Sequence, residues 1–96
     1  MLIYVDIDGT ICTQTKSDYI NAKPIKESIN KINLLYNEGN TIIYWTARGG
    51  HSKTDWTELT TKQLEEWGCL YHKLVCNEKP SYDLLICDKT KRIEEI

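Results

Sequence analysis

Residues 2–10 have the sequence Leu2-Ile3-Tyr4-Val5-Asp6-Ile7-Asp8-Gly9-Thr10. The apolar run at its start is typical of a buried strand and is too short for a signal peptide or a transmembrane helix. Asp6 and Asp8 are two residues apart, so their side chains point the same way from an extended chain. Gly9 then permits a sharp turn. The stretch therefore predicts a strand that ends in an acidic site, although a solvated acidic turn would have the same composition.

Apolar runs and helical patterns alternate through the rest of the chain. Apolar residues at helical spacing predict one helix that Pro24 opens and Gly39 ends, and a second over residues 56–68. Residues 10–23 are polar and irregular. Further strands are expected over residues 41–46, 70–76 and 84–87. This alternation indicates an α/β fold with a parallel sheet.

Crossover rules predict how the strands lie in the sheet. Right-handed crossovers place the first three strands side by side, and the fourth pairs with the free side of the first. We therefore expect about four strands in the order 3-2-1-4 and a single domain over residues 1–96. Open α/β sheets bind ligands at the carboxyl ends of the strands, next to such a reversal of order.

Polar residues also occur at or beside the other strand ends. Thr46, Ala47 and Arg48 can hold phosphate oxygens through a hydroxyl, an amide and a guanidinium. Lys79 precedes the fourth strand and Asp88 follows it, so they can supply a cation and a further carboxylate. Taken singly, each is more often an ordinary strand or surface residue. Together with Asp6 and Asp8 they predict one pocket for a phosphate and a hard cation such as magnesium.

The composition excludes other classes of function. The net charge is −2 and no basic run is present, so binding to nucleic acid or to a membrane surface is not expected. The four cysteines form no C-x-x-C pair, which favours buried, reduced thiols. A cytoplasmic location is the default expectation.

The chain resembles phosphatases of the haloacid dehalogenase superfamily over essentially its whole length. Residues 6–10 match the first motif of that superfamily and Thr46 matches the second. Lys79, in Glu78-Lys79-Pro80, matches the third, and residues 82–89 resemble the fourth. Short, capless phosphatases encoded with capsule or surface-polysaccharide genes share the Lys-Pro pair and the minimal length. The resemblance implies a minimal Rossmann-like three-layer core.

The resemblance also implies roles for these residues. Asp6 would attack phosphorus to form an aspartyl-phosphate, and Asp8 would protonate the leaving group and then activate water. Thr46, Ala47, Arg48 and Lys79 would bind the phosphoryl group of a small phosphorylated metabolite or sugar phosphate. Asp6, the backbone carbonyl of Asp8, and Asp88 would hold magnesium. The chain departs from the pattern at Cys87, where relatives usually carry an aspartate and a thiol is a poor magnesium ligand.

The connecting segments leave no room for a cap domain. Closure over the substrate is then expected from residues 12–22, from residues 49–54, or from a second copy of the chain in a homo-oligomer. His51 and Trp56 can contact a leaving group, although a solvated loop histidine and a helix-core tryptophan are the more common explanations.

Two rival interpretations stay open at this point. A catalytically weak module that binds phosphorylated ligands is favoured by Cys87 and disfavoured by the intact Asp6 and Asp8 pair. A signalling receiver domain also carries an acidic pair after its first strand, but its phosphoacceptor follows the third. Here the third strand ends in Val75-Cys76-Asn77 and offers no aspartate.

Overall fold

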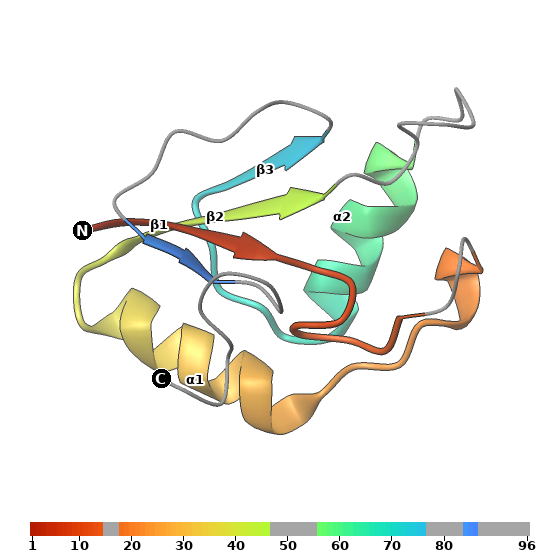
Figure 1. Cartoon of the computed structure of the whole chain (residues 1–96), viewed down its shortest axis with the longest axis horizontal. Helices are drawn as coiled ribbons and strands as arrows, with labels where there is room; N and C mark the ends of the chain where they lie inside the picture. The colour runs from red at the N-terminus through yellow and green to blue at the C-terminus, as the bar shows by residue number, and fades with distance from the viewer. Residues whose placement is uncertain (15–17, 47–55, 77–83, 87–96) are drawn as a thin grey trace.

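The computed structural model describes residues 1–14, 18–46, 56–76 and 84–86 of the chain. Within them the strands are β1 (Leu2–Asp6), β2 (Thr41–Thr46), β3 (Lys73–Cys76) and β4 (Leu84–Ile86). They form one sheet in the order β3-β2-β1-β4, and every pair is parallel (Figure 1). The expected α/β class with a parallel sheet is confirmed. The carboxyl ends of all these strands therefore meet at one edge of the sheet.

Two helices and one short 3-10 turn accompany the strands in the described residues: α1 (Lys26–Asn37), α2 (Thr57–Glu66) and η1 (Tyr19–Asn21). Gly39 and Gly68 follow α1 and α2 with φ angles of 100° and 74°. These left-handed conformations suit glycine and end each helix where the sequence predicts it.

The expected start of the first helix is wrong by two residues. Pro24 does not open α1 but forms an antiparallel bridge with Cys12. Ile25 donates its amide to the carbonyl of Ile11 at 2.8 Å and leaves its side chain 37% exposed. This pairing holds the backbone of Ile25 extended, so the helix can begin only at Lys26.

The expected start of the third strand is also early. Asn33 of α1 accepts the amide of Leu70 and donates to the carbonyl of Gly68, both at 2.9 Å. These bonds hold the chain against α1 after α2 ends. Pairing with β2 begins only at His72, whose amide donates to Ile42 at 2.8 Å, and β3 itself starts at Lys73.

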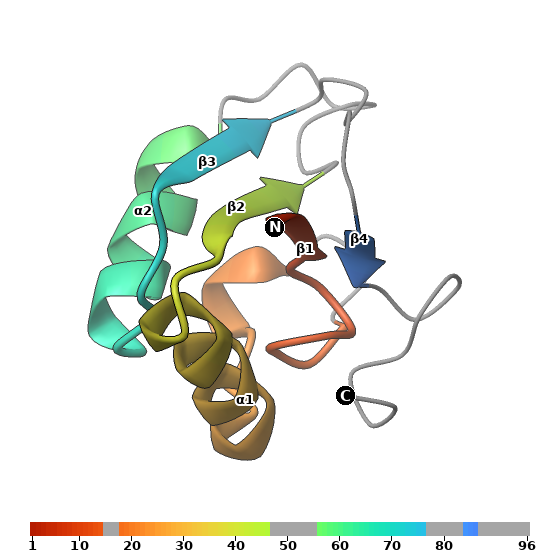
Figure 2. The same ribbon diagram turned by 90° about the vertical axis from the view of Figure 1, so that its left-hand side faces the viewer.

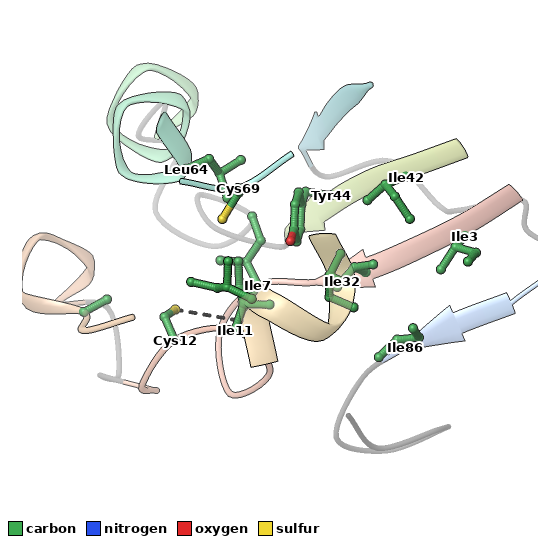
Figure 3. Close-up of a cluster of buried hydrophobic side chains, with 13 residues drawn as sticks. Ile3, Ile7, Ile11, Cys12, Ile32, Ile42, Tyr44, Leu64, Cys69 and Ile86 are labelled. Atoms are coloured by element: carbon green, nitrogen blue, oxygen red, sulfur yellow. Dashed lines mark hydrogen bonds between the residues drawn. The ribbon is translucent and has the colours of Figure 1, made fainter. Parts of the chain in front are cut away.

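The core lies on one face of the sheet. Ile3, Val5 and Ile7 are almost fully buried, whereas the side chains between them are half-buried. Figure 2 shows α1 and α2 on the same side of the sheet, and Figure 3 shows Ile3, Ile7 and Ile11 in a cluster with Tyr44 and Leu64. The described residues thus supply one helical layer. The described ranges do not contain a second helical layer, so the expected three-layer core stays a prediction.

Membrane-spanning helices are not found in the described part of the chain. The longer of its two α-helices, α1, has 12 residues, and no helix there is long and apolar enough to cross a bilayer.

Candidate active site

Asp6 and Asp8 lie at the carboxyl end of β1, between β2 and β4 in the sheet. Both side chains are half-buried, and Ile7 between them is fully buried in the core. Alternation along β1 turns the side chain of Asp6, its last residue, to the face opposite the buried Ile3 and Val5, and Asp8 follows two residues later. Oδ1 of Asp6 accepts the amide of Ile7 at 2.9 Å, which fixes one oxygen of this carboxylate.

A tight turn follows the acidic pair. Gly9 has a φ of 84°, a left-handed conformation that other residues rarely adopt. The amides of Thr10 and Ile11 donate to the carbonyl of Ile7 at 3.2 and 3.1 Å, and the amide of Gly9 donates to the carbonyl of Cys12 at 2.9 Å. The turn brings Cys12 back beside Asp8, with which it forms a parallel bridge.

The thiol of Cys12 lies next to the carboxylate of Asp8. Its Sγ lies 3.5 Å from Oδ1 of Asp8 and 3.6 Å from the carbonyl oxygen of Ile7, and Figure 3 draws the second contact. Sequence reasoning treats Cys12 as an ordinary buried thiol. It is indeed buried, but it is also a polar neighbour of Asp8. A donor four residues after a carboxylate, across a glycine turn, is the signal that points to this contact.

Thr10 adds a second feature that the sequence does not single out. Its side chain is 1% exposed, and its Oγ1 is buried without a hydrogen-bond partner in the part of the chain that the structure describes. Buried hydroxyls are normally hydrogen-bonded. The turn therefore contains a buried hydroxyl, that of Thr10, where an apolar side chain would pack equally well.

The structure places Thr46 at the same sheet edge as Asp6 but on the other face. Trp45 is the cross-strand partner of Asp6, and Thr46, one residue further on, is 1% exposed on the face that the helices cover. Adjacent residues of a strand point to opposite faces. The other predicted site residues lie outside the described residues: Ala47, Arg48, His51, Lys79, Cys87 and Asp88.

The short helix η1 (Tyr19–Asn21) lies near the carboxyl ends of the strands (Figure 1). The chain on either side of it is joined by the amide of Thr13, which donates to the carbonyl of Lys23 at 2.9 Å. Within η1, the ring of Tyr19 packs edge-to-face on Trp56, with ring centroids 5.1 Å apart. Figure 1 shows η1 on the side toward which the strands point. Trp56 is half-buried, and its ring packs on η1.

The donor chemistry of the acidic pair fits a hard divalent cation. Such cations take oxygen ligands and, in the case of magnesium, usually keep several waters. Asp6 offers carboxylate oxygens, and Asp8 offers a backbone carbonyl, next to one another at the end of β1. Asp88, the third predicted ligand, lies outside the described residues, and within those ranges no group of three acidic, histidine or cysteine side chains could hold a metal.

Comparisons with known proteins find similarity in structure only. No protein-family model matches the chain, and no curated protein matches it. A structure of a target protein from Vibrio cholerae has a TM-score of 0.70 at 23% identity, covering 82% of this chain and 71% of that one. A D,D-heptose 1.7-bisphosphate phosphatase from B. bronchiseptica, complexed with magnesium and phosphate, has a TM-score of 0.59 at 18% identity.

The match to the heptose bisphosphate phosphatase covers 83% of this chain and 51% of that protein. The chain thus spans about half the length of that neighbour. At these identities the likeness shows a shared fold alone. The chemistry has to be argued from the residues of this chain.

Proposed function

We propose that this chain is a magnesium-dependent phosphomonoester hydrolase of the haloacid dehalogenase type. The observation that carries the proposal is the position of Asp6 at the carboxyl end of β1, with the half-buried Asp8 two residues further on. Open parallel sheets bind ligands at this edge. The fold likeness to a phosphatase whose structure holds magnesium and phosphate supports the same assignment.

Asp6 supplies the nucleophile in this proposal. A carboxylate oxygen of Asp6 attacks phosphorus, the bond from phosphorus to the leaving oxygen breaks, and an aspartyl-phosphate forms. Asp8 donates a proton to the departing oxygen. It then takes a proton from the water that attacks phosphorus, which breaks the bond to Asp6 and releases phosphate.

The remaining groups bind charge rather than react. A magnesium ion held by Asp6, the backbone carbonyl of Asp8, and Asp88 would neutralise charge on the phosphoryl group. Ala47, Arg48, Lys79 and, from its buried position at the same sheet edge, Thr46 would bind the phosphoryl oxygens. Positioning and charge stabilisation supply most of the catalysis in phosphoryl transfer. We infer a capless enzyme acting on a small phosphorylated metabolite or sugar phosphate, with a second copy of the chain able to close the open site.

The test is hydrolysis of a simple aryl phosphate by the purified chain, with magnesium and then with a chelator. We expect magnesium-dependent release of phosphate that Asp6→Asn abolishes, because an amide is not a competent nucleophile. Glu27→Gln, an exposed change on α1, is the matched control and should keep native turnover. Turnover that survives in a folded Asp6→Asn variant would reject the role of Asp6.

The alternative function is a catalytically weak module that binds phosphorylated ligands. Cys87, where a metal-binding aspartate is expected, favours it. Calorimetric binding of inorganic phosphate in magnesium, without turnover of any phosphomonoester, would support this alternative over the hydrolase.

A further inference from the structure

Cys12 contacts the carboxylate that the proposed reaction uses for proton transfer. Its Sγ lies 3.5 Å from Oδ1 of Asp8. We propose that Cys12 is a positioning residue, whose thiol donates a hydrogen bond that sets the orientation of the Asp8 carboxylate. The inference rests on the proposed function, since it assigns Cys12 a part in the same site.

Among the described residues, two acceptors lie within reach of the single hydrogen of the thiol. The second acceptor is the carbonyl of Ile7, at 3.6 Å, which already accepts the amides of Thr10 and Ile11. Oδ1 of Asp8 is slightly closer, and a charged acceptor forms the stronger hydrogen bond. The thiol hydrogen therefore goes preferentially to the carboxylate.

The donor is fixed much more firmly than the acceptor. Cys12 has no exposed surface, so water does not compete for its thiol. Its backbone is held on two sides, by the amide of Gly9 at 2.9 Å and by the bridge to Pro24. Asp8, by contrast, is half-buried. A fixed donor on one oxygen restricts rotation of the carboxylate, which presets the direction in which Asp8 offers its proton.

This role predicts a particular dependence on the substrate. A poor leaving group, such as an alkoxide, needs protonation as its bond to phosphorus breaks, whereas a good one, such as a nitrophenolate, does not. Loss of the donor should therefore slow alkyl phosphates more than aryl phosphates. A purely structural role of Cys12 in the turn would slow both equally.

The experiment measures kcat on one alkyl and one nitrophenyl phosphate for Cys12→Ala and Cys12→Ser. We expect Cys12→Ala to lose on the order of tenfold on the alkyl substrate and less than about twofold on the nitrophenyl substrate, as fits loss of one weak hydrogen bond. Cys12→Ser keeps a hydroxyl donor and should recover most of the loss. In an Asp8→Asn background, Cys12→Ala should change neither rate further.

A buried cysteine outside the site provides the matched control. Cys69 is 9% exposed in the core, so Cys69→Ala should lower the melting temperature without changing the ratio of the two rates. A second measurement does not need turnover: the S–H stretching band that Cys12→Ala removes should shift in Asp8→Asn.

The outcomes separate the two proposals. Equal loss on both substrates, no rescue by serine, or an unmoved S–H band would overturn the role of Cys12 while the hydrolase assignment stands. A folded native protein with no turnover of either substrate would instead overturn the hydrolase assignment, and the positioning role with it.

Discussion

The side-chain amide of Gln63 donates a 2.6 Å hydrogen bond to the backbone carbonyl of Tyr19, which lies 44 residues earlier in the chain. Gln63 is in α2 and is 6% exposed, although its position in the helix matches the apolar stripe. Together with the packing of Tyr19 on Trp56, this bond attaches η1 to α2 at two points. These two contacts therefore fix the position of η1 beside the strand ends.

Replacing Gln63 should weaken this attachment. In Gln63→Leu the side chain keeps much of its apolar bulk but cannot donate, so the carbonyl of Tyr19 loses its partner on α2. The carbonyl of Tyr19 still accepts the amide of Ala22, so we expect the free energy of unfolding to fall by about 0.5–1.5 kcal/mol, the usual net contribution of one hydrogen bond. Denaturant unfolding measures it. Lys62→Leu, an exposed change on the same helix, is the control, and equal stability of the two variants would contradict the prediction.

Asp8→Asn should behave differently from the loss of the nucleophile. The variant keeps Asp6 but has no proton to exchange, so turnover of an alkyl phosphate should fall by roughly 10²- to 10⁴-fold. An aryl phosphate with a good leaving group should lose much less. Steady-state rates on the two substrates provide the comparison, and an equal loss on both would argue against a general-acid role.

Local sequence signals account for much of the fold. The β-branched composition of Thr41–Thr46 predicts a strand there. The helix ends follow from Gly39 and Gly68, because glycine readily adopts the left-handed conformation that ends a helix. The position of Asp6 at the end of β1 follows in the same way from the apolar run before it.

Contacts between distant residues account for the differences. Ile25 has the spacing of a helix residue, but pairing with Ile11 keeps it out of α1. Leu70 has the composition of a strand, but Asn33 holds it against α1. Gln63 is equally ambiguous, because its spacing marks a buried position without indicating what its amide binds. Partners so far apart in sequence leave no local pattern, so periodicity cannot identify them.

The buried thiol of Cys69 predicts a loss of stability in alkaline solution. Burial raises the pKa of Cys69 from 9.0 to about 11, and an interaction with Tyr44 offsets part of the rise. Because the raised pKa belongs to the folded state, the stabilisation is complete below pH 9 and is lost as the pH rises toward 11. Burial also raises the pKa of Tyr44 and of Tyr71, so their losses follow the same sign.

Melting curves from about pH 8 to about pH 11 test this prediction, because this range contains both the ordinary and the raised pKa of the thiol. The melting temperature of the native chain should fall with rising pH, and Cys69→Ala should make the fall shallower. Cys76→Ala removes a half-buried cysteine from β3 and should leave the native slope. Parallel curves for the native chain and Cys69→Ala would show that this thiol does not contribute.

Cys87 is the position at which the chain departs from the phosphatases it resembles, and it lies outside the described residues. Its neighbour Ile86 is fully buried and pairs with Val5, in the face that the helices cover. Strand alternation predicts that the residue after Ile86 belongs to the face of Asp6. We therefore expect Cys87→Asp to add an oxygen ligand beside Asp6 and to lower the magnesium concentration that gives half-maximal activity. Asp88→Asn should raise this concentration.

A magnesium titration of activity, paired with a melting curve, distinguishes this result from its alternative. If Cys87 is instead a core residue, Cys87→Asp buries a charge, and the melting temperature should drop with no change in magnesium dependence.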